Sequence, residues 1–256
     1  MSLFDWAGLA AVTFGAAVLY AAGGFGFAVV AAPLFLLLVE PVRAIQLVII
    51  ISTGLSIVVL PRLWRAIAPR LLMRLMAGSL FGLPLGLLAF RHSDPRLVRV
   101  AAGVIVLVFA VVVAARRRGV RGGGRRKLVM TPGRDLTAGA ASGAATALAG
   151  MSGPPVLIYL ILVEAPPRTV RATLLAFFAL IYLATLAAHA ATIGVPEQTW
   201  MTAGILIPFS LIGGFIGRPL GDRLGADAFA FLAIGLLGAT GLYTLAAAAF
   251  AAGHEP

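Results

Sequence analysis

The chain alternates between long apolar segments and short polar ones, and two of the apolar segments are unusually long. They cover about residues 7–39 and 136–163. A helix that crosses a hydrocarbon core about 30 Å thick needs only about 20 residues, so each segment is too long for one crossing and too short for two. The other apolar segments each match one bilayer thickness and predict helices over about 44–60, 73–90, 97–115, 171–191, 201–217 and 228–251.

A glycine cluster interrupts each long segment. The first cluster is Gly23-Gly24-Phe25-Gly26, and the second is Gly150-Met151-Ser152-Gly153, followed directly by Pro154-Pro155. Glycine weakens a helix interior and proline interrupts it, and irregular backbone at bilayer depth is tolerated only beside protein or a polar cavity. Two arrangements fit this pattern: a re-entrant helical hairpin that enters and leaves on one side of the membrane, or one long, tilted and broken helix.

The two halves of the chain follow the same order of short motifs. Each long segment ends in Leu-Val-Glu, the next helix opens with Arg-Ala, and a later helix carries two glycines four residues apart. The matched residues are Glu40 and Glu164, Arg43 and Arg171, Gly82 and Gly213, and Gly86 and Gly217. We expect the later glycines, with Gly78, to serve close helix packing. The sequence predicts a first transmembrane repeat over 1–115, a basic cytoplasmic connector over 116–134 and a second repeat over 135–256.

Composition places the chain among membrane proteins. Hydrophobic residues make up 61% and charged residues 11% of the 256 residues, and the mean hydropathy is +1.04, whereas soluble domains average about 25% charged residues. The predicted fold class is an all-α, polytopic integral membrane protein in which each half has a broken helix and three transmembrane helices. The net charge of +11 lies in loops between apolar segments, which argues against nucleic-acid binding. No cysteine is present, and neither a metal nor a cofactor is expected.

The distribution of basic residues predicts the topology. Residues 62–74 carry four arginines, and residues 116–135 carry eight basic residues and one acidic residue, so both loops should be cytoplasmic. If the long segments are hairpins, each half crosses three times, the halves are inverted and both termini are periplasmic. If they span the membrane, each half crosses four times and both termini are cytoplasmic. The terminal segments contain no Lys or Arg, which favours the hairpins.

In the hairpin arrangement, two half-helices would begin near the middle of the membrane. The unpaired N–H groups and the positive dipole end of such a start suit a small oxyanion. The polar residues Gln46, Thr53 and Ser56 recur at spacings that share one helix face, which could line a polar cavity. The predicted substrate-binding residues are Gly23, Gly24, Gly26, Gln46, Thr53, Gly150, Ser152, Gly153 and Pro154. Glu40, Arg43, Glu164 and Arg171 lie at the ends of the broken segments, where they either pair at the membrane interface or form a gate or anion funnel.

Two other functions fit parts of the sequence. Gly150-Met151-Ser152-Gly153 matches the G-x-S-G pattern around the nucleophile of rhomboid-type intramembrane proteases, with His189 as the base. The first cluster has Phe25 where Ser152 stands, and a protease gives no reason for the duplication, so an enzyme is not the prediction. An anion channel is the nearest alternative to a carrier. If the protein is not a hydrolase, His189 is expected at the membrane interface because it lies near a predicted helix end.

Taken together, these motifs resemble the sulfite exporter TauE/SafE family of bacterial membrane transporters. The resemblance covers nearly the whole chain: the first glycine cluster through Pro33, Arg43-Ala44, the glycines of the 73–90 helix, the basic connector, Ser152-Gly153-Pro154-Pro155 and Arg171-Ala172. It implies a multi-pass protein of the bacterial inner (plasma) membrane that exports sulfite or an organosulfonate as a secondary transporter. The expected partners are a small anionic substrate and the lipid bilayer, and association into a homo-oligomer is left open.

Overall fold

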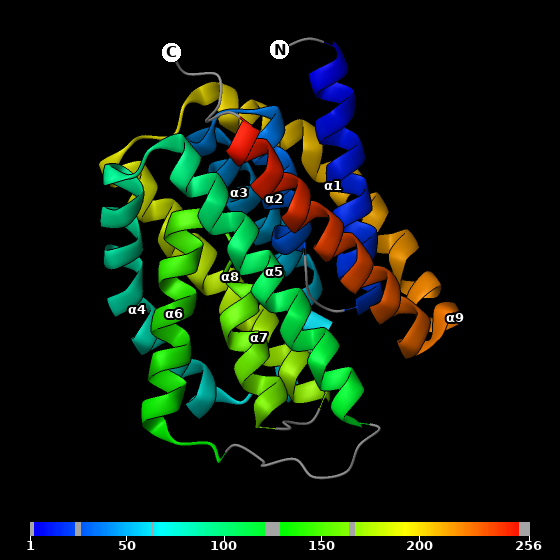
Figure 1. The fold of residues 1–256 in the computed structure, drawn as a ribbon. Helices are drawn as coiled ribbons and strands as arrows, with labels where there is room; N and C mark the ends of the chain where they lie inside the picture. Colours follow the sequence, from blue (N-terminus) through cyan, green and yellow to red (C-terminus); the bar gives the residue numbers. More distant parts are fainter. Residues whose placement is uncertain (1–2, 24–26, 63, 121–128, 164–166, 251–256) are drawn as a thin grey trace.

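The structure is a computed structural model that describes residues 3–23, 27–62, 64–120, 129–163 and 167–250. These residues form helices and no strand (Figure 1), which confirms the predicted all-α class. Short 3-10 turns at Leu60–Arg62 and Trp64–Ala66 join the third and fourth helices. The helices are α1 (Leu3–Gly23), α2 (Phe27–Leu38), α3 (Pro41–Val59), α4 (Pro69–His92), α5 (Pro95–Val120), α6 (Pro132–Ala149), α7 (Gly153–Leu162), α8 (Pro167–Thr192) and α9 (Glu197–Phe250).

Proline sets where many of these helices begin. The first residues of α3, α4, α5, α6 and α8 are Pro41, Pro69, Pro95, Pro132 and Pro167. Proline suits this position because the first N–H of a helix has no partner and because the fixed φ of proline is already helical. On α6, Thr131 adds a side-chain cap by accepting a hydrogen bond from the amide of Arg134. These helices therefore start a few residues earlier than the hydrophobic pattern predicts.

Both long apolar segments fold as hairpins. A Cβ placed on Gly8, near the start of α1, would lie 3.4 Å from the side chain of Leu38 at the end of α2. In the second segment, Tyr159 near the end of α7 donates a hydrogen bond to Asp135 at the start of α6. Each pair of helices is therefore antiparallel, and Figure 1 shows the two hairpins opening toward opposite ends of the molecule. The structure thus adopts the re-entrant arrangement rather than the broken span.

The last helix differs most from the prediction. The sequence predicts separate helices over 201–217 and 228–251, whereas the chain is helical throughout α9, with Pro208 and Pro219 inside it. A straight helix of 54 residues would be about 80 Å long. Figure 1 instead shows α9 folded back into two limbs, as helices that contain proline commonly bend. The first limb lies along α1, and the second meets α5, where Gly241 faces Leu107.

The two limbs of α9 complete an inverted arrangement of the halves. The start of α1 and the end of α9 lie at the top of Figure 1, and the end of α5 and the start of α6 lie at the bottom. After the first hairpin, α3, α4 and α5 cross the molecule; after the second, α8 and the two limbs of α9 do so. This order is the one expected when both long segments are hairpins.

The outer surface suits a lipid environment. In the described part of the chain, four helical segments are long and apolar enough to cross a membrane: they lie in α3, α4, α8 and the first limb of α9. Large apolar side chains face outward from them, including Phe81 of α4, which is 76% exposed, and Phe215 of α9, which is 78% exposed. Contiguous apolar surface of this kind is rare on proteins that face water. The surface therefore agrees with a polytopic membrane protein.

Glycines bring two pairs of helices into backbone contact. A Cβ added to Gly82 of α4 would lie under 3.0 Å from the backbone of Ala140 in α6, and one added to Gly217 of α9 would lie as close to Val18 in α1. Gly78 and Gly86 meet α6 in the same way, and Gly213 meets α1. The packing role predicted for these glycines is confirmed. Each contact joins a helix of the first half to a helix of the second, so the halves interlock.

Candidate functional site

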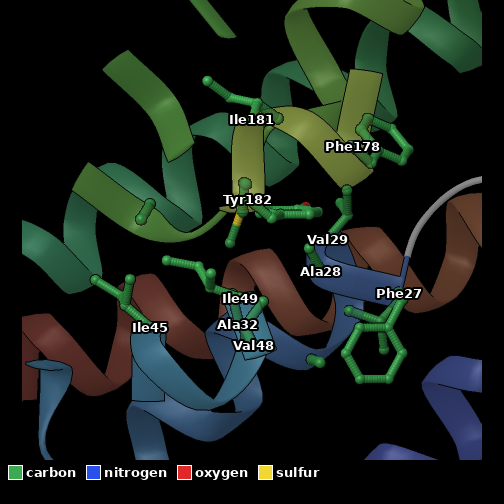
Figure 2. Packing of buried hydrophobic residues seen from close by; sticks show 14 of the residues in the cluster. Phe27, Ala28, Val29, Ala32, Ile45, Val48, Ile49, Phe178, Ile181 and Tyr182 are labelled. Carbon is green, nitrogen blue, oxygen red and sulfur yellow. The ribbon is translucent and has the colours of Figure 1, made fainter. Parts of the chain in front are cut away.

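A small cavity lies where the second helices of the two hairpins begin. Figure 2 shows Val29 of α2 pointing toward Phe178 and Tyr182 of α8 in this region. The cavity measures about 20 Å³, which is room for about one water molecule. The residues that line it are Tyr20 of α1, Phe27, Ala28 and Val29 in the first turn of α2, Ser52, Leu55 and Ser56 of α3, Gly153 at the start of α7, and Phe178 and Tyr182 of α8.

Gly150 builds the break between α6 and α7. It ends α6 in the left-handed conformation (φ 70°), which glycine adopts without steric cost. Its amide donates to the carbonyl of Thr146, as in an αL cap, and the amide of Met151 donates to that of Ala145. The Ser142 hydroxyl donates to the carbonyl of Ser152 and so ties the chain after the break to α6. The start of α7 is therefore held in a defined position beside the cavity.

Ser152 directly precedes α7, and its hydroxyl is free. A serine at this position normally accepts a hydrogen bond from the amide of the second or third helical residue. Those residues are Pro154 and Pro155, which have no N–H. Ser152 is fully buried, and its Oγ has no hydrogen-bond partner among the described residues. The hydroxyl can therefore donate to a ligand, beside the Gly153 amide, which is the one backbone donor in the first three positions of α7.

Ser52 and Tyr182 add further hydroxyl groups from α3 and α8. The Tyr182 hydroxyl lies close to both Ser52 and Ser152, yet neither serine Oγ makes a hydrogen bond of good geometry within the described residues. An unsatisfied buried polar group costs about 1–3 kcal/mol, which a bound ligand would recover. Among the described lining residues there is no Asp, Glu, Lys or Arg. The cavity therefore offers neutral donors and two helix starts, which attract an anion through partial charges.

A larger cleft opens at the end of the molecule where α2 ends and α3 begins. Its volume is about 1190 Å³. The Nε of Arg99 donates to the carbonyl of Leu36 at 3.0 Å, and Arg43 donates to Thr202 Oγ1 at 2.9 Å. The buried Nε of Arg43 has no partner among the described residues. The cleft has an excess of positive charge, because the charged residues in its described lining are Glu40, Arg43, Arg91 and Arg99.

An apolar layer separates the cleft from the cavity. Gln46 lines the cleft and Ser52 lines the cavity, six residues further along α3, which corresponds to about 9 Å. Figure 2 shows Ile49 of α3 and Ala32 of α2 packed together in this region, and both are fully buried. Passage between the two spaces therefore requires the helices or side chains of this layer to move.

The predicted substrate-binding residues lie in more than one place. Gly150, Ser152, Gly153 and Pro154 form the break and the first turn of α7. Gln46 lies in the cleft instead, where its Nε2 donates to the carbonyl of Gly194 at 2.8 Å. The Thr53 hydroxyl donates to a carbonyl of its own helix at 2.7 Å and does not line the cavity. Of the predicted polar face of α3, Ser56 does line the cavity, together with Ser52, which was not predicted.

Some predicted residues cannot be placed. Gly23 is the last residue of α1, while Gly24, Gly26 and Glu164 lie outside the described residues, as does the side chain of Arg171. Their partners in the predicted gate, Glu40 and Arg43, line the same cleft. The gate therefore stays a prediction for the second half of the chain.

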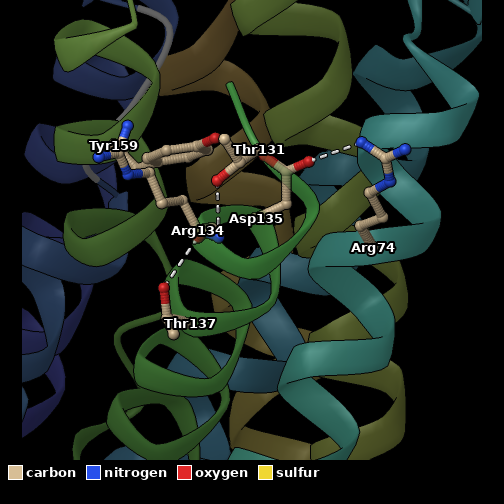
Figure 3. A network of polar contacts seen from close by, with 6 residues as sticks. All are labelled: Arg74, Thr131, Arg134, Asp135, Thr137 and Tyr159. Atoms are coloured by element: carbon tan, nitrogen blue, oxygen red, sulfur yellow. Dashed lines mark hydrogen bonds and ion pairs between the residues drawn. The ribbon is translucent and has the colours of Figure 1, made fainter. Parts of the chain in front are cut away.

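An ion pair between the exposed Arg74 and the buried Asp135 holds the base of the second hairpin. Asp135 of α6 is 1% exposed and accepts a hydrogen bond from Arg74 of α4 at 3.2 Å and another from the hydroxyl of Tyr159 on α7. Figure 3 shows Arg74 and Tyr159 approaching this carboxylate from different sides. A buried carboxylate is stable only with such partners. The pair joins three helices, so the hairpin that carries Ser152 is held at its base as well as at its break.

Ser152 and His189 do not form the nucleophile and base of a hydrolase. Such a pair requires a hydrogen bond of about 2.6–3.2 Å between the two side chains. Ser152 Oγ and both ring nitrogens of His189 are buried without a hydrogen-bond partner in the described part of the chain. The contact that hydrolysis would need is therefore missing from these residues.

The comparison with known protein families gives one result. The chain matches the profile described as "Sulfite exporter TauE/SafE" over residues 9–244, which is nearly its whole length. Neither the curated proteins nor the solved structures contain a significant match to it. The family is one of membrane transporters of sulfur anions, in agreement with the apolar helices. The chain therefore belongs to the sulfite exporter TauE/SafE family.

Proposed function

We propose that this protein is a secondary transporter that exports sulfite or a small organosulfonate and holds it where α2 and α7 begin. The observation that carries the proposal is the meeting of two re-entrant helix starts at one cavity lined by Ser52 and Gly153, with the free hydroxyl of Ser152 on the residue directly before Gly153. First-turn amides and hydroxyls are the donors that an oxyanion needs. The three oxygens of sulfite can accept from both hairpins at once, so one ion would bridge the two halves.

Alternating access is the transport mechanism that we propose. A cavity of about 20 Å³ is too small for sulfite, so binding requires the two hairpins to separate. The cleft with Arg43 and Glu40 would act as the anion funnel on one side. Because close glycine contacts hold α4 to α6 and α9 to α1, the two hairpins would move apart together with these helices, which opens the cavity to each side in turn. An anion channel would use the same donors but would show no saturable exchange.

Labelled-sulfite counterflow into proteoliposomes tests the proposal with Ser152→Ala. Removing one hydrogen bond to a charged ligand costs about 1.5–3 kcal/mol, so we expect about a ten- to hundredfold higher half-saturating sulfite concentration. Thr137→Ala removes an exposed hydroxyl at the other end of α6 and should behave as the wild type. Competing sulfonates should reduce the flux. Wild-type protein that is folded yet shows no saturable counterflow with sulfite or sulfonates would refute the proposal.

We further propose that the protein lies in a bacterial inner membrane with the cleft on the periplasmic side. The segments at the cleft end carry only Arg43, Arg91, Arg96 and Arg99 of the 20 Lys and Arg residues, so the opposite end should be cytoplasmic. A phosphatase reporter that works only in the periplasm should therefore be active at the C-terminus and inactive when joined after Val120, the end of α5. The reverse pattern would contradict this orientation.

A further inference from the structure

His189 of α8 is a buried ionisable side chain to which the proposed function gives no role. It is fully buried, and neither ring nitrogen has a hydrogen-bond partner among the described residues. Its ring stacks on that of Phe90 of α4, with ring centroids 5.9 Å apart and planes inclined by 21°. Phe90 also lines the open cleft. A buried ionisable side chain without a partner is costly, and here Phe90, which lines the cleft, stacks directly on the imidazole.

The carbonyl of Ala147 faces this imidazole from the end of α6. The cap at Gly150 uses the carbonyls of Ala145 and Thr146, so the Ala147 carbonyl receives no backbone hydrogen bond from the described residues. Carbonyls at the end of a helix carry its negative partial charge and stabilise a nearby cation. The Ala147 carbonyl is thus a ready acceptor for an N–H of a protonated His189.

The break in the second hairpin therefore has two polar ends of opposite sign. The start of α7 places Gly153 at the cavity, and the Ser152 hydroxyl lies beside Tyr182, which also lines the cavity. The end of α6 presents its free carbonyl to His189, two turns further along α8. Seven helical residues correspond to about 10 Å. An anion at one end and a proton at the other would lie close enough to attract each other.

We propose that His189 binds a proton that is carried together with the anion, which rests on the proposed transport function. Movement of Phe90 lets water in the cleft deliver a proton to a ring nitrogen, and one N–H of the imidazolium then donates to the Ala147 carbonyl. The N–H bond forms as an O–H bond of a hydronium ion in the cleft breaks, which leaves water behind. At about 10 Å and an effective dielectric constant of about 20, the imidazolium strengthens anion binding on the order of tenfold.

Among the described residues, no charged side chain contacts His189 and could stabilise its protonated form in place of the bound anion. Burial and the Ala147 carbonyl are the influences that act on the ring. The other charged or titratable side chains of the surrounding elements are exposed, line the cleft or lie at the far ends of their helices. They are Glu40 and Arg43 before and in α3, Arg70, Arg74, Arg91 and His92 of α4, Arg96 and Arg99 of α5, and Arg134 and Asp135 of α6. The titratable Tyr182 of α8 is instead buried and lines the small cavity. His189 therefore binds its proton most strongly while the anion is bound.

The test compares counterflow with pH-driven accumulation in proteoliposomes, using labelled sulfite and the variants His189→Phe and His189→Gln. Phenylalanine keeps the ring that stacks on Phe90 and removes two unsatisfied buried atoms, so this variant should fold. For the wild type, acid on the sulfite side should drive accumulation above the equilibrium level. For both variants, we expect counterflow with about tenfold weaker sulfite affinity and no accumulation driven by the pH gradient.

Each outcome has a separate meaning. Accumulation in either variant equal to that of the wild type would overturn the assignment of His189, and a wild type with counterflow but no response to the gradient would overturn proton coupling. Absence of wild-type counterflow would instead refute the proposed transport function. As a second measurement, sulfite binding to detergent-solubilised wild type should take up one more proton than binding to His189→Phe at the same pH. Because both proteins are measured at the same pH, the protons that sulfite itself takes up or releases are the same in both experiments and cancel. Equal proton uptake by the two proteins would contradict the proposal.

Discussion

Replacing Gly153 with leucine should abolish sulfite counterflow, with a loss of about a hundredfold or more. A Cβ on Gly153 would already lie 3.5 Å from Phe178 and 3.8 Å from Val29. The additional atoms of leucine would enter the cavity of about 20 Å³ and cover the Gly153 amide. Forcing such atoms into a packed site costs about 1–3 kcal/mol, and the anion would also lose a donor. Counterflow at saturating sulfite, normalised to inserted protein, measures the effect.

Gly153→Ala is the matched control for the leucine variant. The added Cβ would make only ordinary van der Waals contacts, and the backbone of Gly153 is not among the described glycines with positive φ. We expect transport within a few-fold of the wild type and the same elution from a sizing column in detergent. Normal transport by folded Gly153→Leu protein would show that the start of α7 does not hold the anion.

Replacing Gly82 with alanine should damage the fold itself. The added Cβ would lie under 3.0 Å from three backbone atoms of Ala140, and backbone cannot move aside as a flexible side chain does. The clash has to push α4 away from α6, which opens contacts along both helices. We expect the free energy of unfolding to fall by about 3 kcal/mol or more, which is the upper end of the cost of overpacking a site. Thermal unfolding in detergent should show this as a drop of about 10 °C.

Gly204→Ala in the first limb of α9 separates this clash from a general effect of glycine replacement. No atom lies within 4 Å of a Cβ added to Gly204. Alanine is favoured over glycine in a helix by about 1 kcal/mol, so this variant should be as stable as the wild type or more so. Equal stability of Gly82→Ala and Gly204→Ala would contradict the close approach of α4 and α6.

Hydrophobic length and glycine placement were sufficient to predict the overall fold. Segments 7–39 and 136–163 had to be hairpins or broken spans on length alone, and the lack of basic residues at the termini pointed to the hairpins that the structure contains. The spacing of Gly82 and Gly86 likewise indicated close packing, although it could not name the partner helix. That partner lies in the other half of the chain, and a sequence motif contains no information about pairing over such a distance.

The anion site was only partly predictable. The break at Gly150 followed from local sequence, because glycine and proline act on the backbone where they stand, whereas the role of Ser152 stays a prediction. Of the predicted polar face of α3, Ser56 lines the cavity, whereas Gln46 and Thr53 do not, and Ser52 was passed over. Ser52 lies four residues before Ser56, but which face meets the cavity depends on how α3 packs against α2 and α8. His189 was expected at the membrane interface and is fully buried, because Phe90 of α4 covers it.

The crossed glycine contacts also constrain how the chain can be made. A ribosome releases α1 first, yet the helix that fits the backbone of α1 at Phe14 and Val18 is α9, which is synthesised last. The glycine face of α4 similarly waits for α6, beyond the connector. A nascent first half therefore sits in the membrane with its two tightest helix contacts unformed. Final packing has to follow synthesis of nearly the whole chain, and the order of insertion cannot be the order of assembly.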